Sequence, residues 1–201
     1  MNKSLLISIW SMLALLSARA QGEWSFENYH YLGQQTEAGI IPVMHWETKH
    51  NWYTEVRYNY EEKGTCSVFS GYSFRGGREW EWRVTPLGGF SAGRFNGLSA
   101  GMNAEISRGR FYISSDNQYS VPFDKKGSAF VYSWSEVGIE ILKHGLLGVS
   151  VQYFRDAESK SFAPGLLAGI RLKRITFPAY VFEPFSSSRY FVVGVNYELK
   201  K

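Results

Sequence analysis

The sequence predicts an all-β protein, a closed antiparallel up-and-down transmembrane β-barrel of about 12 strands, with 10 strands as the alternative. Three observations support this fold class. Many segments alternate apolar and polar residues with a period of two, the connections between these segments alternate in length, and the chain opens with an export signal. A helix would not show this period, because its residues return to one face every three or four positions.

The first 20 residues have the composition of a secretory signal peptide. Lys3 precedes an apolar run from Leu5 to Leu16, and Ala18-Arg19-Ala20 places small residues before a cleavage point at Gln21. A membrane-spanning helix needs about 20 apolar residues, so this run is too short to be an anchor. The expected organisation is a signal peptide, 1–20, followed by a single outer-membrane β-barrel domain, 21–201.

About 12 segments have the length and pattern of strands that cross a bilayer obliquely, for which about 9–11 residues suffice. In chain order they are 24–33, 40–48, 51–60, 65–74, 79–85, 98–107, 110–120, 128–141, 147–153, 165–172, 174–183 and 191–198. The segment 24–33 has an alternative interpretation as a periplasmic tail. The segment 128–141 changes phase near Ser135, where Val137, Ile139 and Ile141 become the apolar face, so a bulge is expected there.

The two faces of these segments suit different surroundings. In 98–107 the apolar face holds Leu98, Ala100, Met102, Ala104 and Ile106, and the polar face holds Ser99, Gly101, Asn103, Glu105 and Ser107. Soluble barrels alternate in the same way with the apolar face inward, so the period alone does not define the environment. The polar faces, rich in Gly, Ser, Asn, Glu and Arg, suit a wet lumen. Aromatic residues near strand ends are expected to form an interfacial girdle: Trp52, Tyr60, Trp80, Trp82, Tyr153, Tyr190 and Tyr197.

Connection lengths test the barrel independently, because outer-membrane barrels have short periplasmic turns and longer external loops. Short connections fall near 75–78, 108–109, 143–145 and Lys173, and longer ones near 90–96, 121–127, 155–162 and 183–188. Strict alternation places both termini in the periplasm. It also requires an even number of strands, which is why 24–33 is counted as one.

Charged residues of both signs recur on the polar faces and are expected in the lumen. They are Glu55, Arg57, Glu81, Arg83, Glu105, Asp116, Glu136 and Arg171. Unpaired charges in a narrow barrel are costly, so these side chains should pair across strands. Two interpretations stay open: a salt-bridge network that fills the lumen, or a charged eyelet that selects solutes. Large inward residues such as Phe154, Tyr180 and Phe182 should narrow the lumen in both cases.

Basic residues gather at the expected periplasmic turns, within which the sequence pattern places no acidic residue. This basic rim consists of Arg75, Arg78, Arg108, Arg110, Lys143, Lys173 and Arg174. One interpretation is a solvated rim that touches lipid phosphates. The other is a docking surface for an anionic periplasmic partner.

Catalytic and metal chemistry have little support in the sequence. Acyl hydrolysis in a barrel would use a serine activated by a histidine. Apart from His30 in the segment 24–33, which has the alternative interpretation as a periplasmic tail, His45 is the one histidine inside an expected strand, with no serine two residues away. His45 and Glu47 form a lone pair of metal ligands, and Cys66 is the single cysteine. No catalytic residue, metal site or cofactor is therefore assigned. Without Lys3 and Arg19, the 22 basic residues exceed the 18 acidic ones by two, which is not a nucleic-acid signature.

Three segments resemble parts of a group of uncharacterised bacterial proteins predicted to be small outer-membrane β-barrels. They are 130–136 (FVYSWSE), 165–169 (GLLAG) and 176–182 (TFPAYVF). The resemblance covers roughly the second half of the chain and implies the barrel fold, with no known catalytic motif. The C-terminus is similar to the terminal strand signal of assembled barrels, but it departs from that pattern because Glu198-Leu199-Lys200-Lys201 follows Tyr197.

The predicted function follows from these features. The protein is expected in the outer membrane of a bacterium, either as a narrow solute pathway or as a structural or accessory subunit of an outer-membrane complex. The alternative is a lipid-active barrel enzyme, an acyl hydrolase or transferase. The expected partners are outer-membrane lipid and other outer-membrane or periplasmic subunits, and not nucleic acid.

Overall fold

The computed structural model describes residues 22–33, 39–125 and 127–199, all of them in strands and their connections. The strands are β1 (Gly22–Leu32), β2 (Gly39–Thr48), β3 (Trp52–Tyr58), β4 (Cys66–Tyr72), β5 (Phe74–Gly76), β6 (Glu81–Ala92), β7 (Gly97–Arg108), β8 (Phe111–Pro122), β9 (Phe130–Ile141), β10 (Gly145–Arg155), β11 (Lys160–Leu172), β12 (Ile175–Phe182) and β13 (Tyr190–Leu199). Among these residues no helix is long and apolar enough to cross a membrane. The predicted signal peptide, 1–20, lies outside the described residues.

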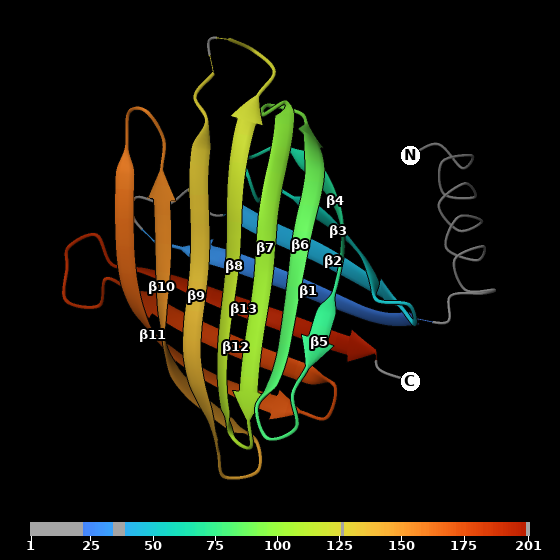
Figure 1. Cartoon of the computed structure of the whole chain (residues 1–201). Helices are drawn as coiled ribbons and strands as arrows, with labels where there is room; N and C mark the ends of the chain where they lie inside the picture. Colours follow the sequence, from blue (N-terminus) through green and yellow to red (C-terminus); the bar gives the residue numbers. More distant parts are fainter. Residues whose placement is uncertain (1–21, 34–38, 126, 200–201) are drawn as a thin grey trace, which may run out of the picture.

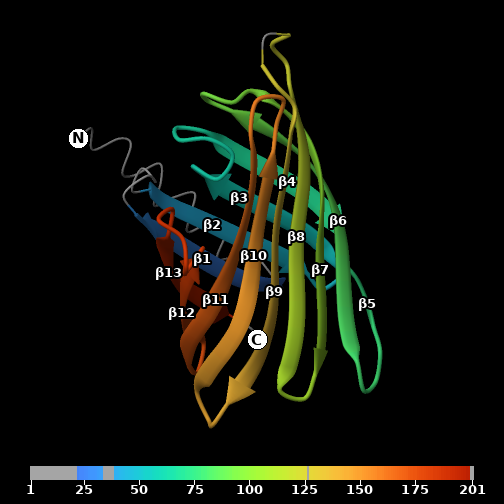
Figure 2. The ribbon, with the colours of Figure 1, turned by 90° about the vertical axis from the view of Figure 1, so that its left-hand side faces the viewer.

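The strands form a closed antiparallel barrel. Neighbours in sequence pair with each other, β1 pairs with β13 to close the ring, and β4 and β5 both pair with β6 in one continuous register. Since β4 and β5 lie end to end, the barrel has 12 strands, and the predicted fold class is confirmed. Figure 1 looks through the wall formed by β6–β10 onto the steeply crossing strands β1–β3, β12 and β13, and Figure 2 shows the same barrel from the side.

Short turns and longer loops alternate along the chain, as predicted. The turns near Asn51, Gly77, Gly109, Leu142 and Lys173 each contain a residue with positive φ, between 54° and 98°. Such residues let two or three positions reverse an antiparallel pair. The loops between β3 and β4, β6 and β7, β8 and β9, β10 and β11, and β12 and β13 have four to seven residues, against two to four in the turns, and lie at the opposite end of the strands. We call these the turn end and the loop end.

The outer face of the barrel is apolar. Leu98, Met102, Val149 and Ile170 project outward and are 45–56% exposed, and Cys66 is exposed on the same face. Residues one position away along the same strands, such as Ser99 and Ser150, are buried in the interior. The predicted period-two alternation is therefore the alternation between an apolar outside and a mostly polar inside.

The strand pairing decides the structure of the two segments whose sequence pattern was ambiguous, 24–33 and 128–141. The segment 24–33 is a strand, because β1 pairs along its length with both β2 and β13. The bulge expected near Ser135 is wrong, since β9 pairs with β8 and β10 in unbroken registers. Phe130, Tyr132 and Trp134 face the interior, so the apolar residues of the first half of β9 belong to the inner face. The phase never changes; the lumen itself is aromatic there.

The aromatic girdle is only partly as predicted. Trp52, Trp80 and Trp82 are outward and 41–58% exposed, but Tyr60 and Tyr190 point into the barrel and are corrections to the prediction. Asn59 has a φ of 59° just beyond the end of β3, which turns the chain so that the next residue leaves the alternation. Tyr190 lies two positions before the fully buried Val192 on β13, so the two side chains face the same, inner side.

Candidate functional site

The inner face of the barrel is divided into an aromatic side and a polar side. The aromatic side lies on β9–β13 and centres on a buried cluster of Trp134, Leu146, Ala163, Leu167, Tyr180, Phe182 and Val192. Phe182 and Val192 are completely buried, and Tyr180 is 4% exposed. This side is packed like the core of a soluble protein. The prediction that Tyr180 and Phe182 narrow the lumen is confirmed.

Aromatic rings from separate walls meet inside the barrel. The rings of Tyr29 on β1 and Trp134 on β9 lie 5.2 Å apart, and those of Tyr60 and Tyr132 lie 5.3 Å apart and nearly perpendicular. Four strands lie between β1 and β9 along the shorter path of the wall, so the first contact crosses the lumen. This aromatic bridge, formed by the two ring pairs, confines the open part of the lumen to the polar side.

The polar side is organised around Glu55 on β3, whose side chain is 1% exposed. The Tyr53 hydroxyl donates a hydrogen bond to Glu55 Oε2 at 2.7 Å, and Asn103 Nδ2 donates to the same oxygen at 3.4 Å. Arg57 forms an ion pair with Oε1. A carboxylate removed from water is costly unless charge and hydrogen bonds compensate, and these neighbours supply both.

Arg57 connects polar residues on two separate walls of the lumen. Its Nη1 donates to Gln118 Oε1 on β8 at 2.7 Å, and its guanidinium lies over the rings of Tyr60 and Phe69 at 4.3 and 4.5 Å. Planar arginine can bind a carboxylate, an amide and two aromatic faces at once, which lysine cannot. The side chain is 5% exposed, so Arg57 is a fixed part of the lumen wall.

His45 on β2 lies between two carboxylates inside the lumen. Its Nε2 is 3.4 Å from Glu27 Oε1, and its Nδ1 is 3.2 Å from Glu55 Oε2. The hydroxyl that contacts the ring belongs to Tyr53. A serine-histidine hydrolase places a seryl hydroxyl at this position and presents it to the acyl chain, whereas His45 faces the interior, on the opposite side of the sheet from the apolar outer face.

At the turn end the polar side continues as a chain of ion pairs. Arg83 Nη1 lies 3.2 Å from Glu47 Oε2, and its Nη2 lies 2.6 Å from Glu105 Oε1. Arg75 also pairs with Glu47, which is 6% exposed. The Arg83 and Arg75 side chains are 35% and 43% exposed, so water reaches this part of the lumen.

Asp116 marks open space at the middle of the barrel. It lies at the centre of β8 on the inner face, paired in register with the inward residues Asn103 and Trp134. Although it faces the interior, the side chain of Asp116 is exposed. A narrow barrel packed throughout would bury such a side chain, so the lumen next to Asp116 contains solvent-accessible space.

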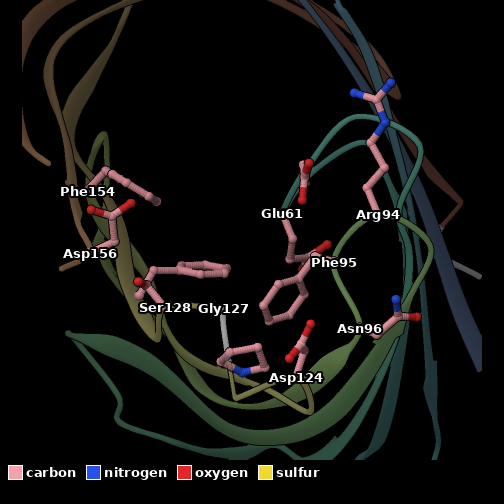
Figure 3. Close-up of a pocket in the computed structure, with 12 residues that line it drawn as sticks. Glu61, Arg94, Phe95, Asn96, Asp124, Gly127, Ser128, Phe154 and Asp156 are labelled. Atoms are coloured by element: carbon pink, nitrogen blue, oxygen red, sulfur yellow. The ribbon is translucent and has the colours of Figure 1, made fainter. Parts of the chain in front are cut away.

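A cavity of about 470 Å³ opens at the loop end and forms a vestibule. In Figure 3 side chains from several loops project toward this shared space. Its lining combines acidic residues, one arginine and a cluster of phenylalanines: Glu61, Glu62, Asp124, Asp156, Arg94, Phe95, Phe130 and Phe154. The backbone N–H groups of Ser159 and Glu158 donate to Asp156 and lower the pKa of its carboxyl, so this side chain stays ionised.

All of the predicted lumen residues lie on the inner face, but they form separate groups. Glu55 and Arg57 pair at the centre, and Arg83 and Glu105 pair toward the turn end. The others are placed as follows: Glu136 contacts the Tyr112 hydroxyl at 3.3 Å on the aromatic side, Arg171 pairs with Glu140 at the turn end, Glu81 is exposed at the start of β6, and Asp116 borders open space.

The sequence interpretation did not assign several interior residues to the lumen. They are Glu27, His45, Glu47, Tyr53, Gln118 and Glu140. The available signal was the alternation of sides along the strand. His45 and Glu47 lie two and four positions after the buried Val43 and therefore share its inner face, whereas Met44 between them faces outward. Their partners lie on strands distant in sequence, so parity alone indicates the face and not the contact.

The basic rim lies at the turn end, but part of it is paired. Arg75 turns inward to Glu47, and Arg108 Nη2 lies 2.9 Å from Glu79 Oε2 while its guanidinium covers the Trp80 ring at 5.3 Å. The expectation that these turns contain no acidic residue is therefore wrong, because Glu79 lies within the β5–β6 turn. Arg78 lies in the same β5–β6 turn as Glu79, and Arg110, Lys143, Lys173 and Arg174 lie in the other turns.

Metal binding was not predicted, and the described part of the chain holds no group of three or more His, Cys, Asp or Glu side chains arranged around a common metal position.

Solved porin structures share this fold. The KdgM porin superimposes with a TM-score of 0.62 at 11% identity, covering 88% of this chain and 99% of that chain. A KdgM porin in complex with disordered oligogalacturonate superimposes with a TM-score of 0.62 at 11% identity, covering 89% of this chain and 99% of that chain. The NanC porin gives 0.53 at 10% identity, over 88% of this chain and 100% of its own. At these identities the likeness shows the fold. No protein-family model matches the sequence, and no curated protein sequence matches it.

Proposed function

We propose that this protein is an outer-membrane β-barrel that provides a narrow, cation-preferring passage for small hydrophilic solutes. The observation that carries the proposal is the exposed, inward-facing carboxylate of Asp116 at the midpoint of β8. From this point the polar side leads to the vestibule past Gln118 and Glu61. In the other direction it leads past Asn103 to Glu105 and Arg83 at the turn end.

The outer face supports the membrane location. Every strand of the wall carries exposed large apolar side chains, among them Leu98, Val149, Ile170 and Phe191. A soluble monomer rarely exposes contiguous apolar surface on this scale, whereas lipid accommodates it. Export through the signal peptide 1–20 belongs to the same proposal and rests on the sequence, as does outer-membrane lipid as the surrounding partner.

The charge of the interior supports a preference for cations. Carboxylates outnumber basic side chains in the vestibule lining, where Arg94 is the basic member. They also outnumber them on the polar side, and there Glu55 is already neutralised by Arg57 whereas Asp116 has no ion pair among the described residues. The KdgM structure was determined with oligogalacturonate, an oligomer of sugar acids. The acidic interior of this chain disfavours such an anion by simple charge repulsion.

The other predicted functions have less support. Hydrolysis of lipid would need a catalytic group facing the acyl chains, and His45 faces the lumen beside a tyrosine hydroxyl. A purely structural plug would need the polar side to be as tightly packed as the aromatic side, and the exposed Asp116 contradicts that packing.

The proposal is tested in planar lipid bilayers with the refolded, purified protein under a KCl gradient. We expect a small single-channel conductance and a reversal potential whose sign shows a preference for K⁺ over Cl⁻. Asp116→Asn should move the reversal potential toward zero. Glu158→Gln, at an exposed loop carboxylate outside the vestibule lining, is the matched control and should behave like the unchanged protein. Absence of conductance from a folded, heat-modifiable barrel would contradict the passage.

A further inference from the structure

One wall of the vestibule brings an aromatic ring and a carboxylate together. Phe154 lies near the end of β10 with its side chain on the inner face, and Asp156 follows directly after the strand. Both line the cavity of about 470 Å³, and Figure 3 shows them on the same side of it. Arg155 between them belongs to the opposite face of the strand and is exposed there. Cavities of about 300–1,000 Å³ accommodate small ligands, so the pair lies in a space of suitable size.

Phe154 is the accessible end of a row of three phenylalanine rings. The ring of Phe95, in the β6–β7 loop, lies 5.2 Å from that of Phe130 on β9, and the Phe130 ring lies 5.7 Å from that of Phe154. Phe95 and Phe130 are 9% and 8% exposed, whereas Phe154 is half-buried. The two buried rings fix the position of Phe154, whose exposed part lines the cavity.

The Asp156 carboxylate is held through one of its two oxygens. The backbone N–H groups of Glu158 and Ser159 donate to Oδ1 at 2.8 and 2.6 Å, and the Ser159 hydroxyl donates to the same oxygen at 3.0 Å. Within the described ranges no basic side chain pairs with Asp156, whereas Glu61 Oε1 lies 3.8 Å from Arg57 Nη1. Asp156 therefore keeps a negative charge, fixed in position beside Phe154, that a ligand can neutralise.

An organic ammonium ion is the ligand that matches both groups. Its positive charge is attracted to a carboxylate and to the face of an aromatic ring, and its carbon substituents pack against the ring. A hydrated inorganic cation gains little from a phenyl face, and an anion is disfavoured because the described lining contains four acidic residues and one arginine. That arginine, Arg94, lies on the opposite side of the vestibule from Asp156 (Figure 3). The aromatic row thus distinguishes this site from an acidic surface that only attracts counter-ions.

We infer that the vestibule binds organic ammonium cations, which place the charged nitrogen beside Asp156 and their carbon substituents against Phe154. The inference rests on the proposed function for the passage that leads inward from this site. Gln118 donates to Glu61 at 3.3 Å, and the polar side continues from there to the exposed Asp116. A cation bound in the vestibule therefore lies at the entrance of the passage, and the site determines which class of solute the passage admits.

Calorimetric titration of the refolded protein tests the site without any need for conduction. The probe is choline chloride, in a maltoside detergent that carries no ammonium group, and the reference is 3,3-dimethylbutan-1-ol, which has the shape of choline without its charge. We expect choline to bind, and the neutral alcohol to bind more weakly by about tenfold or more. Equal affinity for the two molecules, or no choline binding by the folded protein, would overturn the inference.

Two substitutions separate the carboxylate from the ring. Asp156→Asn keeps an acceptor oxygen for the three donors of the loop, and Phe154→Leu keeps an apolar side chain, so heat-modifiable migration should persist in both. Each should weaken choline binding by about fivefold to tenfold. Glu158→Gln and Phe185→Leu, at an exposed carboxylate and a 99% exposed ring outside the vestibule lining, are the matched controls and should bind choline as before. Unchanged choline affinity in either Asp156→Asn or Phe154→Leu would overturn the inference.

Block of the K⁺ current provides the second measurement. Choline added at the loop end should reduce the K⁺ current through the unchanged protein in a planar bilayer, and should reduce it less in Phe154→Leu. A K⁺ current from a protein that does not bind choline would overturn the vestibule site and leave the passage standing. Choline binding by a barrel that carries no current would overturn the passage and leave the vestibule site standing.

Discussion

Arg57 and Gln118 join two strands that do not pair with each other. The guanidinium on β3 donates to the amide oxygen on β8 at 2.7 Å, across the lumen, and the residues are 61 positions apart in the chain. The same guanidinium is paired with Glu55. This contact ties the polar side of the lumen to both walls, so the charges act as a brace for the barrel as well as a lining.

Arg57→Ala should destabilise the barrel. Removing the guanidinium leaves the buried Glu55 carboxylate without its ion pair, and such breakage of a buried pair costs about 3–5 kcal/mol. We expect a lower urea midpoint for unfolding, measured by tryptophan fluorescence in detergent or lipid. Arg155→Ala, at the exposed end of β10, is the control and should leave the midpoint nearly unchanged. Equal midpoints for both variants would mean that Glu55 is solvated.

Met102→Arg should impair assembly more than Asn103→Arg. Met102 is outward and 45% exposed, and arginine on the lipid face near the midplane costs about 2–4 kcal/mol. Asn103 is inward beside Glu55, which would accept a positive neighbour. Folding yield into lipid vesicles, scored by heat-modifiable migration on a gel, measures the difference. Similar yields for the two variants would show that the outer face does not meet lipid.

Arg83→Ala separates a hydrated passage from a structural plug. The Arg83 side chain is 35% exposed between Glu47 and Glu105, and ion pairs of this exposure contribute less than about 1 kcal/mol. The unfolding midpoint should therefore change little, while the loss of one positive charge frees Glu105, leaves Glu47 paired with Arg75 and increases cation selectivity in the reversal potential. A large fall in the midpoint with unchanged selectivity would support the plug.

Trp134→Ala should widen the lumen. The indole contacts Tyr29 across the barrel, and its Nε1 donates to Ser150 Oγ at 2.8 Å. Its removal opens the aromatic bridge, so single-channel conductance should increase, while the lost packing costs about 3–5 kcal/mol. Trp82→Ala, outward and 41% exposed, is the matched control and should leave the conductance as it is. A decrease in conductance on Trp134→Ala would show that the bridge does not limit the passage.

The strands were predictable because their signal is local. Period-two alternation follows from the pleat and needs no knowledge of which strand is the neighbour. It failed on β9, where Phe130, Tyr132 and Trp134 face inward. An aromatic lumen resembles a lipid face in sequence, and only the pairing with β8 and β10 distinguishes the two.

The contacts inside the lumen were not predictable in the same way. Parity assigns Arg57 to the inner face, but its contact with Gln118 depends on the number of strands and on their tilt. The sequence also indicates which charged residues face the lumen, but not the distances between them. For this reason the sequence could not distinguish a salt-bridge network that fills the lumen from a charged eyelet. The position of Asp116 beside open space favours the eyelet.

The ladder between β1 and β13 has a consequence for biogenesis. Nine residue pairs, from Trp24 with Leu199 to Leu32 with Phe191, join the first strand to the last. While the chain emerges, the hydrogen-bonding edge of β1 must wait for a partner that is synthesised at the very end, and an open edge of this length invites pairing with other chains. Closure is therefore the final and most non-local event of folding, and a chain that lacks β13 would persist as an open, aggregation-prone sheet.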